Sequence, residues 1–351
     1  MASLRRATVV ATLAAAVAAT AGCSSSTRSG SSSTPVTAVA GAIASPTSGP
    51  ADTTARRVVA SFKVGAKIGP IAVGDGWLWA TNANGTVVGE GSNGTTPSLM
   101  RLDATSHAVT ATVDLATNPW TIVVAGGQVY VGLSGGLVAV DAATMRVTGQ
   151  YSAPGDPTAM AATPGTVWVA YAHDGTVVRF DTTSHAVTAT TRIATAAVAM
   201  QQERGEPASL VVAGGAVWAS MDAEGRVARI DPASARITAT YALPTGAGGF
   251  MAAAPDGSIW MTSLGRLVHI DTRTGASQAL TVELPGAGAL VARDREVWVV
   301  GAASKLYHVD VAASRVVETV AFTGGPVAIA DDGDAMWIAS LANDLTHVDI
   351  H

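Results

Sequence analysis

Aspartate is the residue type whose spacing in this chain first suggests chemistry, because carboxylates act as general acids and bases and bind cations. Seven aspartates recur at intervals of 38, 40, 50, 40, 39 and 39 residues, each at the end of an apolar, strand-like segment. Polar turn residues follow them, as in residues 231–234 (Asp-Pro-Ala-Ser), which is typical of an Asx turn. We therefore expect a structural role for all seven, which are Asp103, Asp141, Asp181, Asp231, Asp271, Asp310 and Asp349.

Histidines are the second candidate group. His269, His308 and His347 each stand two residues before a repeat aspartate, which raises the possibility of a three-histidine metal site. In a ring of blades, however, such third-strand positions would lie roughly 14 Å apart, whereas a zinc ligand lies ~2 Å from the metal. We predict no metal site there, and we expect an exposed polar position. His107 and His185 lie in identical octapeptides, which indicates a duplicated outer turn.

His173 is the one candidate for a catalytic base, and Glu206 or Glu224 would be its acidic neighbour. A nucleophilic serine is not marked by any neighbouring base, and the Gly-x-Ser-x-Gly, phosphate-loop and Cys/His metal motifs are absent from the sequence. The sequence therefore offers a weak catalytic candidate, His173, and no catalytic constellation.

The elements that would position these residues follow from a repeat of about 40 residues. Each unit contains only strand-like segments, with one large aromatic residue on an apolar strand ahead of the aspartate. Such a period is typical of four-stranded propeller blades. We predict an all-β fold, a seven-bladed β-propeller of antiparallel four-stranded blades. The aromatic residues are expected to pack between blades, and they are Trp79, Tyr130, Trp168, Trp218, Trp260, Trp298 and Trp337.

The last unit ends after its third strand, and its fourth strand is predicted at the other end of the domain. Residues 58–64 (Val-Val-Ala-Ser-Phe-Lys-Val) match the fourth-strand pattern of residues 109–115 (Val-Thr-Ala-Thr-Val-Asp-Leu). Pairing of this early strand with the final blade would close the ring and remove an exposed sheet edge.

Two insertions, residues 82–98 and 194–206, interrupt the regular period on the same face of the predicted propeller. Loops longer than the architecture requires are common places for binding surfaces. We therefore expect a binding face there. Its candidate residues are Asn82, Asn84, Asn118, Trp120, Asp156, His173, Asp174, Gln201, Glu203, Arg204, Glu206, Asp222 and Glu224.

The N-terminus predicts export. Arg5 and Arg6 precede an uncharged apolar stretch, and residues 20–23 (Thr-Ala-Gly-Cys) resemble the lipobox of bacterial lipoproteins. We expect a signal peptide over residues 1–22, lipidation of Cys23, a flexible Ser/Thr/Gly/Pro-rich tether to residue 55, and the propeller over residues 56–351. The protein would then be a monomer held outside the cytoplasm on the cell membrane, or secreted if Cys23 is not lipidated.

Composition narrows the function classes. The chain is 48% hydrophobic and 13% charged, which supplies a large core and argues against disorder. Its net charge of −5 argues against nucleic acid as a partner, because such proteins carry a basic surface.

The repeat resembles bacterial seven-bladed propellers of the YVTN, NHL and virginiamycin B lyase kind over residues 57–351. Residues 79–82 (Trp-Ala-Thr-Asn) are similar to the YVTN signature, and residues 217–232 follow the shared cadence. For a lyase, the resemblance implies elimination on cyclic streptogramins by a histidine base and glutamate-bound magnesium. For a lactonase-like propeller it implies a calcium ion, for which Glu206, Asn118 and Asp156 would be the candidates.

That cadence is specific for the fold and not for an activity. We therefore expect a non-catalytic binding or scaffold module for an envelope protein or a small ligand, without a cofactor. The alternative is a streptogramin lyase, and below it a metal-dependent lactonase, with magnesium or calcium.

Overall fold

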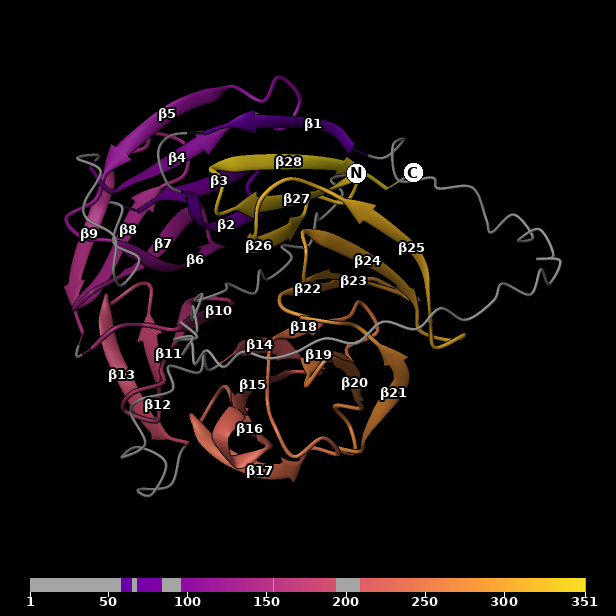
Figure 1. Ribbon diagram of the computed structural model, residues 1–351. Helices are drawn as coiled ribbons and strands as arrows, with labels where there is room; N and C mark the ends of the chain where they lie inside the picture. The colour runs from indigo at the N-terminus through magenta and orange to yellow at the C-terminus, as the bar shows by residue number, and fades with distance from the viewer. Residues whose placement is uncertain (1–57, 65–67, 84–95, 154, 194–208, 351) are drawn as a thin grey trace, which may run out of the picture.

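The computed structural model describes residues 58–64, 68–83, 96–153, 155–193 and 209–350. Within these ranges the strands form seven separate four-stranded antiparallel sheets arranged around a ring (Figure 1). The innermost strands β2, β6, β10, β14, β18, β22 and β26 contact one another in that order, and β26 contacts β2. The predicted seven-bladed propeller is confirmed.

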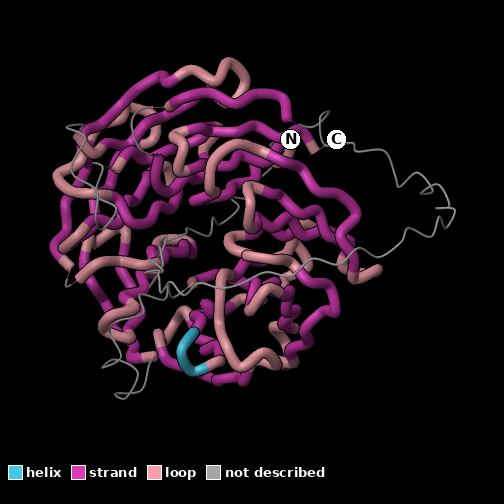
Figure 2. Tube along the Cα trace, viewed as in Figure 1, coloured by secondary structure: helices cyan, strands magenta, loops and turns pink. Residues whose placement is uncertain are grey.

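In blades 1 to 6 the strands succeed one another from the inside of the blade to its outside, and in blades 2 to 6 short turns connect them (Figure 2). In the described residues, blade 1 consists of β2 (Ile68–Gly74), β3 (Trp77–Asn82), β4 (Ser98–Leu102) and β5 (Val109–Asp114). Blade 2 consists of β6 (Pro119–Ala125), β7 (Gln128–Leu133), β8 (Gly136–Asp141) and β9 (Val147–Ser152). Blade 3 consists of β10 (Ala159–Thr163), β11 (Thr166–Tyr171), β12 (Thr176–Asp181) and β13 (Ala186–Arg192).

Blade 4 consists of β14 (Leu210–Ala213), β15 (Ala216–Met221), β16 (Arg226–Asp231) and β17 (Arg236–Ala242). Blade 5 consists of β18 (Met251–Ala253), β19 (Ile259–Ser263), β20 (Arg266–Ile270) and β21 (Ser277–Glu283). Blade 6 consists of β22 (Leu290–Ala292), β23 (Glu296–Gly301), β24 (Lys305–Asp310) and β25 (Arg315–Ala321). A 3-10 turn, η2 (Asp222–Glu224), connects β15 to β16 in blade 4. In the part of the chain that the structure describes, no helix is long and apolar enough to cross a membrane.

Blade 7 confirms the predicted closure. It consists of β26 (Pro326–Asp331), β27 (Ala335–Ser340), β28 (Asp344–Asp349) and, as its outermost strand, β1 (Val58–Lys63). The first and last described strands therefore lie side by side (Figure 1), with Ser61 opposite Thr346 in the antiparallel register. Lys63 adds an ion pair to Asp344, with 3.1 Å between Nζ and Oδ1.

The large aromatic residue of each blade packs toward the following blade, as predicted. Trp79, Trp168, Trp218, Trp298 and Trp337 are fully buried, and Tyr130 is 2% exposed. The Trp79 and Trp218 indoles donate hydrogen bonds to the carbonyl oxygens of Gly74 and Ala213, each five residues back at the end of the innermost strand. Burial with a satisfied N–H explains why an indole fits this interface.

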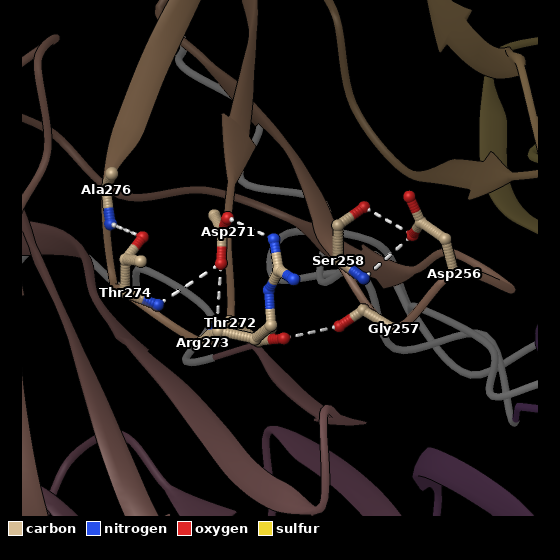
Figure 3. A network of polar contacts seen from close by, with 8 residues as sticks. All are labelled: Asp256, Gly257, Ser258, Asp271, Thr272, Arg273, Thr274 and Ala276. Atoms are coloured by element: carbon tan, nitrogen blue, oxygen red, sulfur yellow. Dashed lines mark hydrogen bonds and ion pairs between the residues drawn. The ribbon is translucent and has the colours of Figure 1, made fainter.

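Six of the seven repeat aspartates form the predicted Asx turns, and for Asp349 the turn stays a prediction. Asp271 Oδ1 accepts hydrogen bonds from the amides of Arg273 (2.8 Å) and Thr274 (3.2 Å), as Figure 3 shows. Thr272 Oγ1 ties this turn to Gly257 O at 2.7 Å. The same backbone bond from Arg273 is the main reason that the pKa of Asp271 lies below its ordinary value. Equivalent amide bonds to the carboxylate occur at Asp103, Asp141, Asp181, Asp231 and Asp310.

The third-strand slot, the position of His269, His308 and His347, differs from its prediction. It was expected to be an exposed polar position, but His308 is only 9% exposed, and His347 and His269 are half-buried. Each histidine lies directly opposite its blade's tryptophan across the strand pair, and His308 stacks on Trp298 with ring centroids 4.2 Å apart. The slot is a cross-strand stacking position.

Candidate functional site

The predicted binding face is the one that carries the loops leading into the blades and the turns between second and third strands. Asn82, at the end of β3, contributes little to its surface, because it is 6% exposed and its Nδ2 donates to Thr96 O at 3.4 Å. Asn118 is half-buried and precedes the first strand of blade 2. Asn82 therefore supports the end of the loop that precedes β4.

Trp120 is the prominent side chain of blade 2 on this face. It sits at an irregularity in β6, where the register shifts between Pro119 and Thr121, and it is 41% exposed. Its Nε1 donates a hydrogen bond to Ser134 Oγ at 2.9 Å, in the turn between β7 and β8. The bulge turns the indole out of the ladder, and the hydrogen bond fixes the ring at the surface.

Blade 3 brings three predicted residues near one another in the fold. His173 and Asp174 are exposed in the turn after β11, and Asp156 is half-buried in the loop leading into β10. Gly155 has a φ of +83°, and a Cβ at this position would lie 3.4 Å from Asp174 Oδ2, so the loop approaches the turn closely. Among the described residues, His173 makes no hydrogen bond or ion pair.

In blade 4, Asp222 has a structural explanation. Its carboxylate accepts a short hydrogen bond from Ser220 Oγ, and that oxygen in turn accepts one from the Ser209 amide at 3.1 Å. Ser209 Oγ accepts from the Met251 amide of blade 5 at 3.0 Å, so the chain of bonds joins two blades. Asp222 and Glu224 begin and end η2, and both are half-buried.

The remaining predicted residues lie outside the described parts of the chain. The two insertions fall almost wholly there, as does the N-terminal leader. These residues are Cys23, Asn84, Gln201, Glu203, Arg204 and Glu206. Over the described ranges, no group of three or more His, Cys, Asp or Glu side chains is placed to hold a metal ion.

Two residues of this face escaped sequence reasoning. Leu264 is 74% exposed in the turn between β19 and β20, and Leu341 is 45% exposed in the turn between β27 and β28. Leu264 also has a positive φ of +47°, a conformation unfavourable for a leucine. The available signal was a leucine standing where Gly, Asn or Asp is typical of a two-residue hairpin turn.

Comparison with known proteins gives a fold. No family model and no curated protein sequence matches the chain. A catalytically inactive virginiamycin B lyase from Staphylococcus aureus, solved with quinupristin, aligns at a TM-score of 0.67 and 15% identity, covering 83% of this chain and 99% of the lyase. The chain has the propeller fold of this lyase.

Two further solved structures agree. A streptogramin B lyase gives a TM-score of 0.66 at 15% identity, covering 83% of this chain and 97% of its own. BamB from Moraxella catarrhalis gives 0.58 at 18% identity, covering 84% and 99%. The resemblance to virginiamycin B lyase propellers is thus confirmed for the fold. A shared fold at this identity carries no activity with it.

Proposed function

We propose that the propeller is a non-catalytic module that binds an envelope protein on the insertion-bearing face, outside the cytoplasm. The observation that carries this proposal is the distribution of exposed large apolar side chains. Over the described residues, those outside the outer strands are Trp120, Leu264 and Leu341. All three belong to this one face, although they come from blades 2, 5 and 7.

The chemistry of these side chains suits a protein partner. Tryptophan is enriched among residues that dominate binding energy, and an anchored indole loses little freedom on binding. Leu264 occupies a backbone conformation that costs about 1 kcal/mol or more, and at 74% exposure it gains little packing in return. Contact with a partner would offset that cost.

Predicted polar residues of the binding face accompany the exposed apolar side chains. His173 and Asp174 are exposed, Asp156 is half-buried, and all three lie near Trp120 in the order of blades. Asp222 is already held by Ser220 in a network between blades 4 and 5. Exposed apolar side chains together with exposed polar groups are typical of protein interfaces.

Location outside the cytoplasm rests on the leader, whose lipobox-like residues 20–23 would place a lipid on Cys23. The tether to residue 55 would let the propeller reach proteins close to the membrane. The test compares the apparent mass of the protein in cells grown with and without globomycin, for wild type and for Cys23→Ala. A shift in mass that depends on globomycin and is lost in Cys23→Ala would support lipidation. An unchanged mass in both proteins would contradict it.

Capture from membrane extract of the source organism tests the binding face. The wild-type domain, residues 56–351, is compared with a triple variant, Trp120→Ala, Leu264→Ala and Leu341→Ala. A triple control, Val147→Ala, Ile237→Ala and Val317→Ala, removes comparably exposed apolar side chains from outer strands. We expect one envelope protein to be retained by wild type and control and to bind the face variant at least about thirtyfold more weakly. Equal retention by all three would contradict the proposal.

The lyase alternative rests on His173, a histidine exposed on the face where such an enzyme would act. Incubation with quinupristin, with magnesium or with EDTA, distinguishes the two functions. Magnesium-dependent ring opening that is lost in His173→Ala would replace the binding proposal. A thermal-shift titration with magnesium and calcium gives a second measurement, because an ion that binds the folded state raises the Tm.

A further inference from the structure

The interface between blades 2 and 3 is built from smaller residues than its counterparts. Across blade 2, Tyr130 lies opposite Ala139, and Ala139 lies opposite Gly149. The corresponding residues of blade 4 are Trp218, Arg229 and Ala239. Blade 2 therefore lacks both the indole and the long side chain that fill this level in blade 4.

A cavity of about 270 Å³ lies between the two blades, and Tyr151 of blade 2 lines it. Its floor is formed by buried residues of blade 3, among them Val169, Tyr171 and Phe180. Its rim is formed by the exposed residues Gln150 and Val187. The cavity is thus open to solvent at the outer strands β9 and β13.

Tyr151 forms one wall of this cavity. Its ring lies 4.8 Å from Phe180 and 5.2 Å from His185 of the next blade. The ring folds back over Gly149, where an added Cβ would lie only 1.8 Å from the Tyr151 hydroxyl oxygen. The glycine therefore leaves the room in which this hydroxyl sits.

Two buried hydroxyl groups at the cavity have no hydrogen-bond partner among the described residues. They belong to Tyr151 and Tyr171, and Tyr171 is only 2% exposed. A buried hydroxyl without a partner is costly, and native proteins leave few of them. Burial, with the negative charge of Asp174, raises the pKa of Tyr171 to about 12, so its hydroxyl keeps its proton near neutral pH.

We propose that this cavity is a binding site for a small uncharged aromatic molecule that carries a hydrogen-bond acceptor. Most of the lining residues are aromatic or aliphatic, with Gln150, Ser152 and His185 as polar members, and no Asp, Glu, Lys or Arg is among them, so an uncharged ligand is favoured over an ion. The two tyrosine hydroxyls would donate to the acceptor. This proposal goes beyond the proposed protein-binding function and does not depend on it.

The size of the cavity sets the probe. A cavity of about 150 Å³ accepts benzene, so 270 Å³ accommodates a two-ring compound. Quinoline and naphthalene have nearly the same shape, but only quinoline carries an acceptor nitrogen. Their dissociation constants for the soluble domain, from ligand-observed NMR titrations, therefore report on the hydroxyls. We expect quinoline to bind at least about fivefold more tightly, which corresponds to one hydrogen bond.

Isosteric variants test whether the tyrosine hydroxyls cause the difference in affinity between the two probes. Tyr151→Phe and Tyr171→Phe each remove one hydroxyl without changing the packing, and the double variant should bind the two probes equally. Tyr241→Phe is the matched control, because Tyr241 occupies the same strand position in blade 4 and stacks on Trp218 there. Val187→Trp should block the rim and weaken both probes, whereas Ile237→Trp at the corresponding position of blade 4 should not.

Three outcomes would overturn the proposal. Absence of binding by both probes would show that the cavity is not a site. Equal affinity of the wild-type domain for quinoline and naphthalene would show that water satisfies the hydroxyls. An effect of Tyr241→Phe as large as that of Tyr151→Phe would place binding elsewhere.

Discussion

Single side chains at the junction of blades 7 and 1 show how histidine can serve packing in this fold. His347 stacks on Trp337 with ring centroids 4.5 Å apart, and its Nδ1 lies 3.2 Å from His107 Nε2, so one imidazole donates to the other. Phe62 stacks on the other side of His107 at 4.8 Å. These rings therefore join the first described strand, blade 1 and blade 7.

His347 makes this junction sensitive to pH. Burial, and next the neighbouring His107, lower its pKa, while Asp332 and Asp349 act in the opposite direction. An unfolded histidine has a pKa of about 6.5, so the unfolded state binds the proton more tightly. The contribution to stability is therefore present above about pH 6.5 and is lost as the pH falls through the lowered folded-state value.

We predict that the Tm of the wild-type domain falls between pH 7.5 and 5, and that His347→Gln makes this decline shallower. Thermal unfolding followed by circular dichroism over this range measures both slopes. His173→Gln is the control, because His173 is exposed and makes no ring contact among the described residues. Identical slopes for wild type and His347→Gln would contradict the prediction.

At the scale of the element, β1 completes a blade that is otherwise made from the end of the chain. It pairs with β28, and Val64 just beyond it is 2% exposed. The ion pair of Lys63 with Asp344 adds little, because the lysine side chain is 70% exposed and such pairs contribute ~0–1 kcal/mol. Backbone pairing and apolar burial are therefore the main contribution of β1.

We predict that deletion of residues 57–64 lowers the Tm by about 10 °C or more. Loss of Phe62 and Val64 removes ~1.5–3 kcal/mol for each side chain, and at about 2–4 °C per kcal/mol the effect is large. Differential scanning calorimetry measures it, and Lys63→Ala should shift the Tm by no more than about 2 °C. A deletion as stable as wild type would show that closure by β1 is dispensable.

The elements were predictable because their signals are local and repeated. The Asx turns of Asp103 and Asp271 follow from residues within three positions, and the strand at residues 58–63 follows from its match to residues 109–114. The histidine slot was misjudged, because stacking of His308 on Trp298 depends on the partner across the strand pair. Local sequence does not report that burial.

At the scale of the whole molecule, the sequence predicts a binding face, which stays a prediction, but it does not predict which apolar side chains are exposed there. Trp120 was predicted, whereas Leu264 and Leu341 acquire meaning only once blades 5 and 7 bring them to the same face as blade 2. The cavity between blades 2 and 3 could not be predicted from the sequence either, because strands of two different blades form its lining. Both features depend on contacts between units far apart in the chain.

Ring closure by strand exchange makes a final prediction about the kinetics of unfolding. Residues 57–64 can be moved to follow residue 350 through a four-residue turn, Thr-Thr-Ser-His, copied from residues 182–185. Blade 7 would then be continuous in sequence, with every native strand pair retained, but no covalent segment would link blade 1 to the outer strand of blade 7. Equilibrium stability should change little, because the same surfaces are buried.

The rate of unfolding should nevertheless rise about tenfold, because separation of blades 1 and 7 would no longer require β1 to be pulled from its sheet. Stopped-flow unfolding in guanidinium, extrapolated to water, measures this rate beside the equilibrium midpoint. A moved strand that leaves both quantities unchanged would show that the covalent link adds no kinetic protection. A large loss of equilibrium stability would show instead that the new turn disturbs β28, and a longer turn would then separate that local effect from the effect of opening the ring.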